Sequence, residues 1–421
     1  MKKWRRFCFV HTADLHLDSP FYCLRASSEP VAQALREATF QAWEQVIAAC
    51  LEHRAAFLLV AGDVFDSSLK SLRAQLRFHQ GLERLARESI AVFVACGNHD
   101  PLDSWPAWSR PPDNTWVFGE QAEARQVRRD GELLAVVTGI SHPHKNETRD
   151  LTALFPPPAG PDAALQVAVL HANAGGQTGH EPYAPCEIED LAGRGYHYWA
   201  LGHVHRGGIL RRDPWIVYPG NTQGRHLRET GPRGCYLVQV EDGAIAEAPR
   251  FVETDAVRWL EQEIDAEGLP TTQELLEAVT ESCRRLQQQG GGRPVAARLT
   301  VRGRTPLYGE LRRLGHLEDL QAEARDRAAA LDPFVWLAEL NFQARPPLDL
   351  EALRNSPDFL GELLGSSEAL TPDDCRQEWE NLFRRLGGPR LVRALAEDWD
   401  PTELALEARY LCADLLSPEA E

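Results

Sequence analysis

The feature that most constrains the fold is a repeated pattern in the first half of the chain, where a short apolar run is followed by a polar cluster. The apolar runs cover residues 7–10, 57–61, 91–94, 167–170 and 198–201. Such continuous runs are typical of strands that are buried on both faces. Helical patterns separate the first three runs, with stripes at Leu35, Ala38, Ala42, Val46 and Ala49, and at Leu72, Leu76, Leu82 and Leu85. This alternation predicts an α/β fold with a largely parallel, layered sheet.

The pattern changes after residue 201. Short alternating runs around residues 208–210, 215–218, 235–238 and 244–246 predict a second, antiparallel sheet that closes a first domain of residues 1–254. An acidic helical pattern over 255–264, a helix over 272–287 and a strand over 295–302 predict a small α/β domain of residues 255–345. After the break at 345–347, a mostly helical region of residues 346–421 is expected.

Length and charge set broad limits on the function. A chain of 421 residues predicts two or three domains, and 43% hydrophobic with 25% charged residues is typical of a soluble globular protein. No apolar stretch reaches the eighteen or so residues of a membrane helix, and no signal peptide is recognisable, so we expect a cytoplasmic protein without membrane contact. The net charge is −17, yet residues 1–250 hold 26 basic and 29 acidic residues. An anionic substrate is therefore expected at the first part of the chain.

Five polar clusters follow the apolar runs. They are Asp14-Leu15-His16, Gly62-Asp63-Val64-Phe65-Asp66, Gly97-Asn98-His99-Asp100, His171 and Gly202-His203-Val204-His205. The carboxyl ends of strands in α/β sheets form a ligand crevice, so the clusters should converge there. Carboxylates, imidazoles and one amide suit Mn²⁺, Fe²⁺ or Zn²⁺. Asp63 could bridge two ions while Asn98 supplies a neutral oxygen, and two ions together favour phosphoester hydrolysis.

Each cluster taken singly has a simpler interpretation. Gly-Asn sequences are ordinary turn formers, and a lone His171 is more often a core or turn histidine than a ligand. Asp66 and Asp100 could cap helices or orient a histidine. The joint occurrence of complementary ligand types at successive strand ends favours the metal site.

The clusters resemble the D-x-H, G-D-x-x-D, G-N-H-[DE], H and G-H-x-H motifs of calcineurin-like metallophosphoesterases, over roughly residues 7–250. The phrases at residues 11–21, 61–66, 218–226 and 233–238 are similar to those of YhaO-type DNA repair exonucleases, relatives of the SbcD nuclease. The resemblance implies a layered fold of two mixed β-sheets flanked by helices, followed by a cap domain and a helical tail. The segment 218–226 departs from the Ser-containing turn of SbcD, which leaves the DNA end preference open.

The resemblance also implies roles for single residues. The first ion would be held by Asp14, His16, Asp63 and His205, and the second by Asp63, Asn98, His171 and His203. Mn²⁺ is the expected ion at both positions, with Fe²⁺ and Zn²⁺ as alternatives. His99 would stabilise or protonate the departing oxygen, with Asp100 as its orienting partner.

Substrate and partner residues are less sharply indicated. Arg206, Arg225, His226 and Arg228 follow the last ligands and could hold a DNA backbone, but an arginine-rich solvated face is an equal alternative. The same two interpretations apply to Arg298, Arg302 and Arg304. The family resemblance implies an SMC-like coiled-coil ATPase that docks on the C-terminal helices, and a homodimer. Candidate docking stripes are Trp379, Leu382, Phe383 and Leu386, and Leu391, Leu395 and Trp399, which could equally form the core of a helical bundle.

Three functions compete at this stage. The first is a Mn²⁺-dependent DNA exonuclease that acts in DNA repair with an ATPase partner. The second is another calcineurin-like phosphatase or a small-molecule phosphodiesterase, which the additional domains disfavour. The third is a non-catalytic scaffold, which the full ligand set disfavours.

Overall fold

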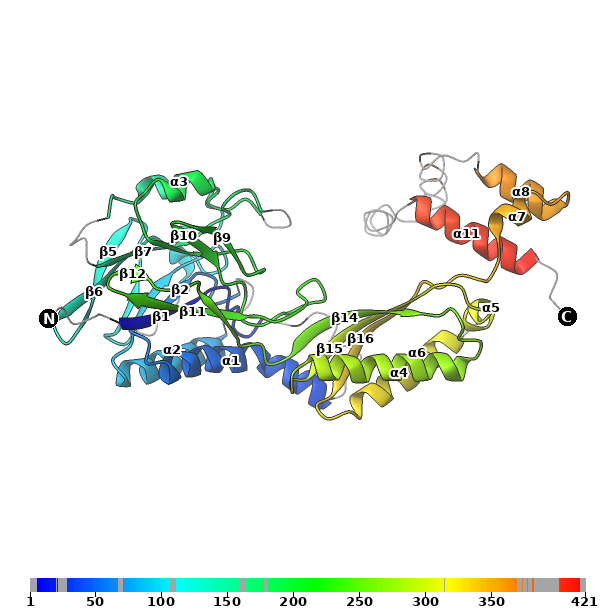
Figure 1. Cartoon of the computed structure of the whole chain (residues 1–421), viewed down its shortest axis with the longest axis horizontal. Coiled ribbons are helices and arrows are strands. Elements are labelled where there is room, and N and C mark those ends of the chain that lie inside the picture. The colour runs from blue at the N-terminus through cyan, green and yellow to red at the C-terminus, as the bar shows by residue number, and fades with distance from the viewer. Residues whose placement is uncertain are drawn as a thin grey trace. The chain divides into compact units, whose positions relative to one another are not determined.

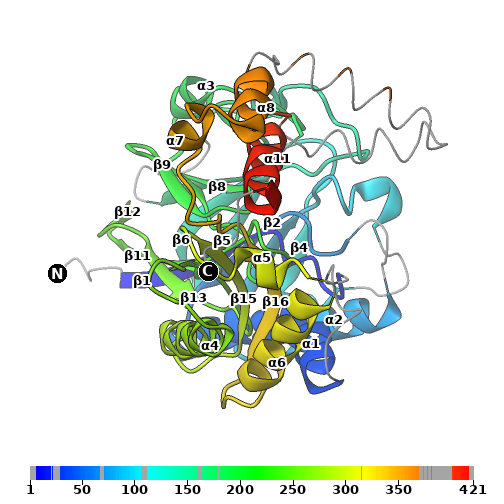
Figure 2. The same ribbon diagram turned by 90° about the vertical axis from the view of Figure 1, so that its right-hand side faces the viewer.

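The chain forms two compact units in the computed structural model (Figures 1 and 2). The first comprises Met1–Leu260 with Gln287–Ala296, and the second Glu261–Leu286 with Ala297–Glu421. The structure describes residues 6–19, 21, 29–66, 71–105, 111–158, 164–177, 181–313, 315–368, 373, 377, 381 and 401–416.

The first sheet of the first unit contains four parallel strands and an antiparallel extension. In spatial order its strands are β12 (Ala244–Ile245), β11 (Gly234–Glu241), β1 (Arg6–Thr12), β2 (Phe57–Ala61), β3 (Ala91–Ala95) and β4 (Thr115–Val117), with β13 (Arg250–Glu253) also paired to β11. Strands β1 to β4 run parallel, and β11 joins β1 in the antiparallel direction. The sheet is therefore mixed.

The second sheet is also mixed. Its order is β5 (Glu123–Arg129), β6 (Glu132–Gly139), β7 (Leu165–His171), β8 (Tyr198–Gly202), β10 (Trp215–Tyr218) and β9 (Gly208–Arg212). Strands β6, β7, β8 and β10 are parallel, whereas β5 and β9 are antiparallel edges. The layered fold with two mixed sheets is thus confirmed.

Two details of the predicted sheets were wrong. The five apolar runs do not share one sheet, since β1, β2 and β3 lie in the first and β7 and β8 in the second. The segment after residue 201 does not form a separate antiparallel sheet, because β9 and β10 extend the second sheet while β11 extends the first. An apolar run indicates burial on both faces, but it does not indicate which strand will be the neighbour.

Alternating side chains of β1 explain the layers. Phe9 points into the core between the sheets, where its ring stacks on Phe57 at 4.7 Å and meets Tyr198 of the second sheet edge-on at 5.2 Å. Val10 points the other way, into a cluster with Trp43. That outer face is covered by α1 (Glu29–Glu52) and α2 (Leu72–Arg87), and α3 (Ile188–Ala192) covers the second sheet.

The predicted stripe on α2 was half right. Leu82 and Leu85 are buried, but Leu72 and Leu76 are 61% and 44% exposed. Ala74 and Phe78 are buried in their place, which also suits helical spacing. Two short 3₁₀ helices, η2 (Leu102–Ser104) and η3 (Leu151–Leu154), lie in the loops of this unit.

The second unit contains a three-stranded sheet in the order β14 (Arg258–Asp265), β15 (Val295–Arg302) and β16 (Val335–Phe342). Helices α4 (Thr272–Gln289) and α6 (His316–Ala329) lie along one side of it, with the short α5 (Tyr308–Leu311) nearby (Figures 1 and 2). The predicted helix over 272–287 and strand over 295–302 are confirmed. The predicted helix over 255–264 was wrong, because Glu261 and Glu263 alternate with less exposed neighbours at the spacing of a strand.

The C-terminal helices are α7 (Leu350–Arg354), α8 (Phe359–Glu368) and α11 (Pro401–Leu416). Leu360, Leu364 and Ala413 join α8 to α11. The predicted docking stripes at Trp379 to Leu386 and Leu391 to Trp399 lie outside the described residues, and the three-domain division stays a prediction. In the described part of the chain, no helix combines the length and apolar character needed to cross a membrane.

Candidate metal centre

The predicted ligands converge at the carboxyl ends of five strands. Asp14 follows β1, Asp63 follows β2, Asn98 follows β3, His171 ends β7, and His203 follows β8. All five are buried. Because β1 to β3 and β7 to β8 belong to facing sheets, the two sheets together bring these residues to one rim of the domain.

The backbone at this rim adopts conformations that most side chains avoid. Asp14, His16, Asp63 and His203 have positive φ angles of 51°, 41°, 51° and 104°. Such angles are uncommon outside glycine and concentrate at functional sites. Gly97 permits a further close approach, since a Cβ atom there would lie 2.2 Å from Asp63 Oδ1. The strand ends are therefore shaped to aim these side chains inward.

Asn98, His171 and His203 form one group of metal-binding atoms, which we call the deep group. Asn98 Oδ1 lies 2.9 Å from His171 Nε2 and 3.1 Å from His203 Nδ1. The other ring nitrogen of each histidine donates to a backbone carbonyl, His171 Nδ1 to Ala61 at 2.9 Å and His203 Nε2 to Glu181 at 2.8 Å. These bonds fix both ring orientations and turn a nitrogen of each toward Asn98.

Asp14, His16 and His205 form a second group, the pocket-side group. Nε2 atoms of His16 and His205 face each other at 3.2 Å, and Asp14 Oδ1 lies 4.0 Å from His205 Nε2. His205 Nδ1 donates to Glu229 Oε1 at 2.7 Å, which leaves Nε2 directed at His16. This separation of the two Nε2 atoms is suitable for two ligands of the same ion.

Asp63 lies between the two groups. Its Oδ2 is 3.4 Å from His171 Nε2 and 3.8 Å from His16 Nε2, while Oδ1 accepts the backbone N–H of His99 at 2.8 Å. Burial alone would raise the pKa of Asp63, but His171 and its neighbours hold it well below the usual range. Burial would likewise lower the pKa of His171, which Asp63 and Asp14 instead raise to about 9. One carboxylate thus couples both groups.

The donor set fits two divalent ions. Ligand atoms of Asp14, His16 and His205, of Asp14, Asp63 and His171, and of His16, Asp66 and His99 each lie within 4.8 Å of one another. Oxygen and imidazole donors without thiolates suit Mn²⁺, Fe²⁺ or Zn²⁺. The residues that hold the imidazoles in place add the outer layer of contacts that metal-binding histidines usually have.

His99 lies beside this donor set and faces Asp66 instead of Asp100, the partner that the family resemblance implied. Its Nδ1 is 3.4 Å from Asp66 Oδ1, and its side chain is 31% exposed. Burial lowers the pKa of His99, but Asp66 and Asp63 raise it above the ordinary value. Asp100, the predicted partner, accepts hydrogen bonds from the backbone N–H groups of Gly97, Val64 and Phe65. Asp100 therefore shapes the loop, and Asp66 orients the histidine.

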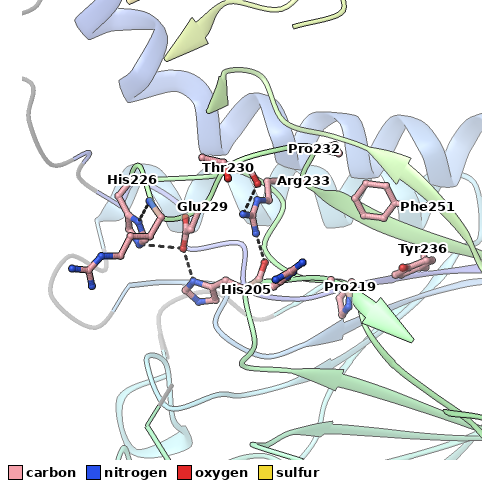
Figure 3. Close-up of a pocket in the computed structure, with 12 residues that line it drawn as sticks. His205, Pro219, His226, Glu229, Thr230, Pro232, Arg233, Tyr236 and Phe251 are labelled. Carbon is pink, nitrogen blue, oxygen red and sulfur yellow. Dashed lines mark hydrogen bonds and ion pairs between the residues drawn. The ribbon is translucent and has the colours of Figure 1, made fainter. Parts of the chain in front are cut away.

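The predicted DNA-contacting residues divide into two kinds. Arg206 and Arg228 are exposed and line a pocket of about 840 Å³ beside His205 (Figure 3). His226 lines it too, with Nε2 3.4 Å from Glu229 Oε1. Arg225 points elsewhere, since its guanidinium donates to Ser19 Oγ at 3.0 Å and lies 3.5 Å from Asp66.

The arginines of β15 are paired in the second unit. Arg298 donates to Glu339 at 2.8 Å, and Arg302 meets Glu263 at 2.8 Å. The carboxylates of Glu339 and Glu263 balance the positive charges of these two arginines, for which the sequence analysis had left a DNA contact as one alternative. A structural role is therefore sufficient to explain both residues.

Two buried residues of the site were missed by the sequence analysis. Glu229 orients His205 and also accepts hydrogen bonds from Asn221 Nδ2 at 2.9 Å and the Arg225 N–H at 2.7 Å. It lies in a loop without an apolar run before it, so no sequence signal indicated it. His142 Nε2 lies 2.6 Å from the His171 carbonyl oxygen. It follows the apolar run of β6, so the same strand-end pattern would have found it.

Comparison with known proteins gives two family matches and several relatives. The calcineurin-like phosphoesterase model matches residues 8–207, and the model of the middle domain of metallophosphoesterase YhaO matches residues 259–345. The uncharacterized metallophosphoesterase YhaO of Bacillus subtilis is 33% identical over 378 residues, which cover 89% of this chain and 90% of that protein.

More distant relatives carry names from DNA metabolism. The DNA double-strand break repair protein Mre11 of Methanosarcina mazei is 24% identical, over 66% of this chain and 44% of that protein. The SbcD component of the nuclease SbcCD of Escherichia coli is 29% identical, over 31% of this chain and 32% of that protein. The chain thus aligns with less than half of the length of each of these two relatives.

Proposed function

The chain belongs to the calcineurin-like phosphoesterase family, and from this premise we propose that it is a two-metal DNA exonuclease. Membership makes it a metal-dependent phosphoesterase with a dinuclear site. The observation that carries the proposal is the donor arrangement around Asp63, where one carboxylate lies against histidines of both groups. DNA as the substrate is supported by the names of the more distant relatives.

Each group of ligands would hold one ion. The pocket-side ion would be bound by Asp14, His16, Asp63 and His205, and the deep ion by Asp63, Asn98, His171 and His203. Mn²⁺ is the ion that we propose at both positions. When bound, two such ions activate water and stabilise the leaving oxygen of an in-line displacement at phosphorus.

His99 supplies the proton for the leaving oxygen. Its Nδ1 faces Asp66, so we assign the proton transfer to Nε2. The hydrogen bond to the Asp66 carboxylate raises the pKa of His99 and so favours its protonated form. The partial exposure of its side chain leaves the ring accessible to a phosphodiester.

The first 250 residues carry most of the positive charge, whereas the rest of the chain is strongly acidic. We therefore propose that DNA meets the first unit, and that the C-terminal helices dock a coiled-coil ATPase of the SMC-like type. A role in DNA repair, a homodimer and a cytoplasmic location complete the proposal.

The test is a cleavage assay with purified full-length protein. End-labelled duplex DNA and, separately, a generic bis-phosphodiester are incubated with Mn²⁺, Mg²⁺, Zn²⁺ or Fe²⁺. We expect shortening of the duplex from its ends with Mn²⁺, and loss of both activities in Asp63→Ala but not in Asp103→Asn, an exposed carboxylate outside the donor set. If the small ester is cleaved while the duplex ends stay intact, the substrate is a small phosphodiester and not DNA.

A further inference from the structure

A pocket of about 840 Å³ opens beside the pocket-side group (Figure 3). Its walls are the segment after β8, the loop that contains His226 to Arg233, and the paired strands β11 and β13. In Figure 3, His205 and His226 lie toward one end, and Tyr236 and Phe251 lie toward the other. This volume is within the range of small-ligand sites, which is roughly 300–1,000 Å³.

Two arginines of the pocket are sequence neighbours of residues at the His205 end. Arg206 follows His205 and Arg228 precedes Glu229; both are exposed and line the pocket, and among the described residues neither guanidinium forms an ion pair. Arg233 differs, because its guanidinium donates to the carbonyl oxygens of His205 at 2.6 Å and Thr230 at 2.9 Å. Arg206 and Arg228 are therefore the cations that an incoming anion can engage.

Glu229 also lines this end, and both of its carboxylate oxygens accept hydrogen bonds from the protein. Its Oε1 accepts from His205 Nδ1 at 2.7 Å, and its Oε2 accepts from Asn221 and from the Arg225 N–H. His226 Nε2 lies 3.4 Å from Oε1. The negative charge is thus engaged by the protein itself.

The opposite end is apolar and aromatic. Tyr236 of β11 lies directly opposite Phe251 of β13 in the antiparallel register, and their rings meet at 5.5 Å with an interplanar angle of 68°. Tyr236 is buried, whereas Phe251 is half-buried. Pro219 and Pro232 extend the apolar wall. Aromatic side chains of this kind accept a base on their faces without sequence preference.

We propose that this pocket is a nucleotide subsite, in which Arg206 and Arg228 bind a phosphate and Phe251 stacks on the base. Its exposed arginines and its aromatic end match the two halves of a nucleotide, an anion and a flat aromatic ring. Its position beside His205 would place that nucleotide next to the phosphodiester bound at the metal centre. This inference rests on the proposed DNA exonuclease function. It adds that one nucleotide of the DNA strand binds in the pocket beside the metal centre.

The test is ligand binding by the full-length protein in the presence of a chelator, so that no metal contributes. Calorimetry is used to measure the affinity for deoxyadenosine monophosphate and for inorganic phosphate. We expect Phe251→Leu to weaken nucleotide binding by about fivefold or more, because base stacking is lost, and to leave phosphate binding unchanged. Arg206→Gln and Arg228→Gln should weaken both ligands.

Arg212→Gln is the matched control, because Arg212 is an exposed arginine of β9 that does not line the pocket. If Arg212→Gln loses as much affinity for the nucleotide as Arg206→Gln and Arg228→Gln do, the proposal is wrong. It is also wrong if the nucleotide binds no more tightly than phosphate. Thermal melting checks the fold of Phe251→Leu. If Phe251→Leu does not fold, Arg206→Gln and Arg228→Gln provide the test. The proposal is wrong if neither of these two variants changes the affinity for the nucleotide.

The two proposals fail in different ways. A protein that does not cut DNA, yet binds the nucleotide through Phe251 and Arg228, disproves the exonuclease and keeps the subsite. A protein that cuts DNA, yet binds the nucleotide equally well without Phe251, keeps the exonuclease and disproves the subsite.

Discussion

The deep group and the pocket-side group each contain two histidines, but these histidines are held differently. In the deep group, His171 and His203 donate to the backbone carbonyls of Ala61 and Glu181. In the pocket-side group, His205 donates to a side chain, Glu229, and its own side chain is 19% exposed. The orientation of His171 therefore follows from the sheet, whereas His203 relies on the loop residue Glu181 and His205 on the loop residue Glu229.

This difference indicates how the site can be altered. Ala61 ends the central strand β2, so the orientation of His171 is built into the core. Glu229 belongs to the loop that also lines the pocket, so a change in that loop would reach both the pocket-side group and the pocket. Changes near the pocket should therefore affect one ion, whereas changes at Asp63 should affect both.

The strongest test of this comparison is Asp63→Ala. Asp63 contacts histidines of both groups, so its removal should abolish binding of both ions and lower turnover by roughly a thousandfold or more. Metal content by mass spectrometry and turnover on a bis-phosphodiester are the measurements. A variant that still retains two ions would show that the groups are independent. Asp103→Asn serves as the control.

Next in size is His99→Ala. His99 faces Asp66 and belongs to neither group, so the variant should keep both ions while turnover falls by about 10²- to 10⁴-fold. Asp66→Asn should lower turnover less, because the histidine stays in place with a lower pKa. The metal content of both variants is measured beside turnover. Loss of an ion from His99→Ala would move His99 into the donor set.

The sequence predicted which candidate ligands would converge better than it predicted their surroundings. Asp14, Asp63, Asn98 and His171 were expected to converge because each follows an apolar run, and the runs did become parallel strands. The assignment of strands to two sheets was not predictable, because burial on both faces looks the same in either sheet.

The contacts around the ligands were predicted least well. Asp100 is adjacent to His99 in sequence and was chosen as its partner, yet Asp66 of another loop occupies that position. Glu229 reaches His205 across 24 residues. Such contacts depend on how loops fold over one another, and a spacing rule within one segment does not capture them.

A smaller effect is expected from changes at Glu229, which contacts a histidine of the pocket-side group only. Glu229→Ala removes the acceptor of His205 Nδ1 and should weaken the pocket-side ion by about 10- to 100-fold while the deep ion is unaffected. Glu229→Gln keeps an acceptor oxygen and should recover part of the affinity. A two-site metal titration of both variants gives the result. Equal weakening at both sites would contradict the division into two groups.

The smallest effect concerns His11, a buried histidine of β1 outside both groups. Burial lowers the pKa of His11 from 6.5 to about 3, whereas His171, equally buried but beside Asp63, has a pKa raised to about 9. Below pH 6.5, His11 is protonated in the unfolded chain but stays neutral in the folded protein. Protonation therefore favours the unfolded state, and His11 makes the protein less stable as pH falls toward 3. Between pH 7.5 and 5.5 its share is on the order of 1 kcal/mol.

His11→Gln removes this titration while leaving polar atoms near Tyr198 and the Leu201 carbonyl. The loss of unfolding free energy between those two pH values, measured with urea in the presence of a chelator, should therefore be smaller in the variant than in the natural sequence. Since all other groups titrate in both proteins, their contributions cancel in the difference. An identical pH dependence would mean that His11 can be protonated in the folded protein, and that burial without a carboxylate is not what separates it from His171.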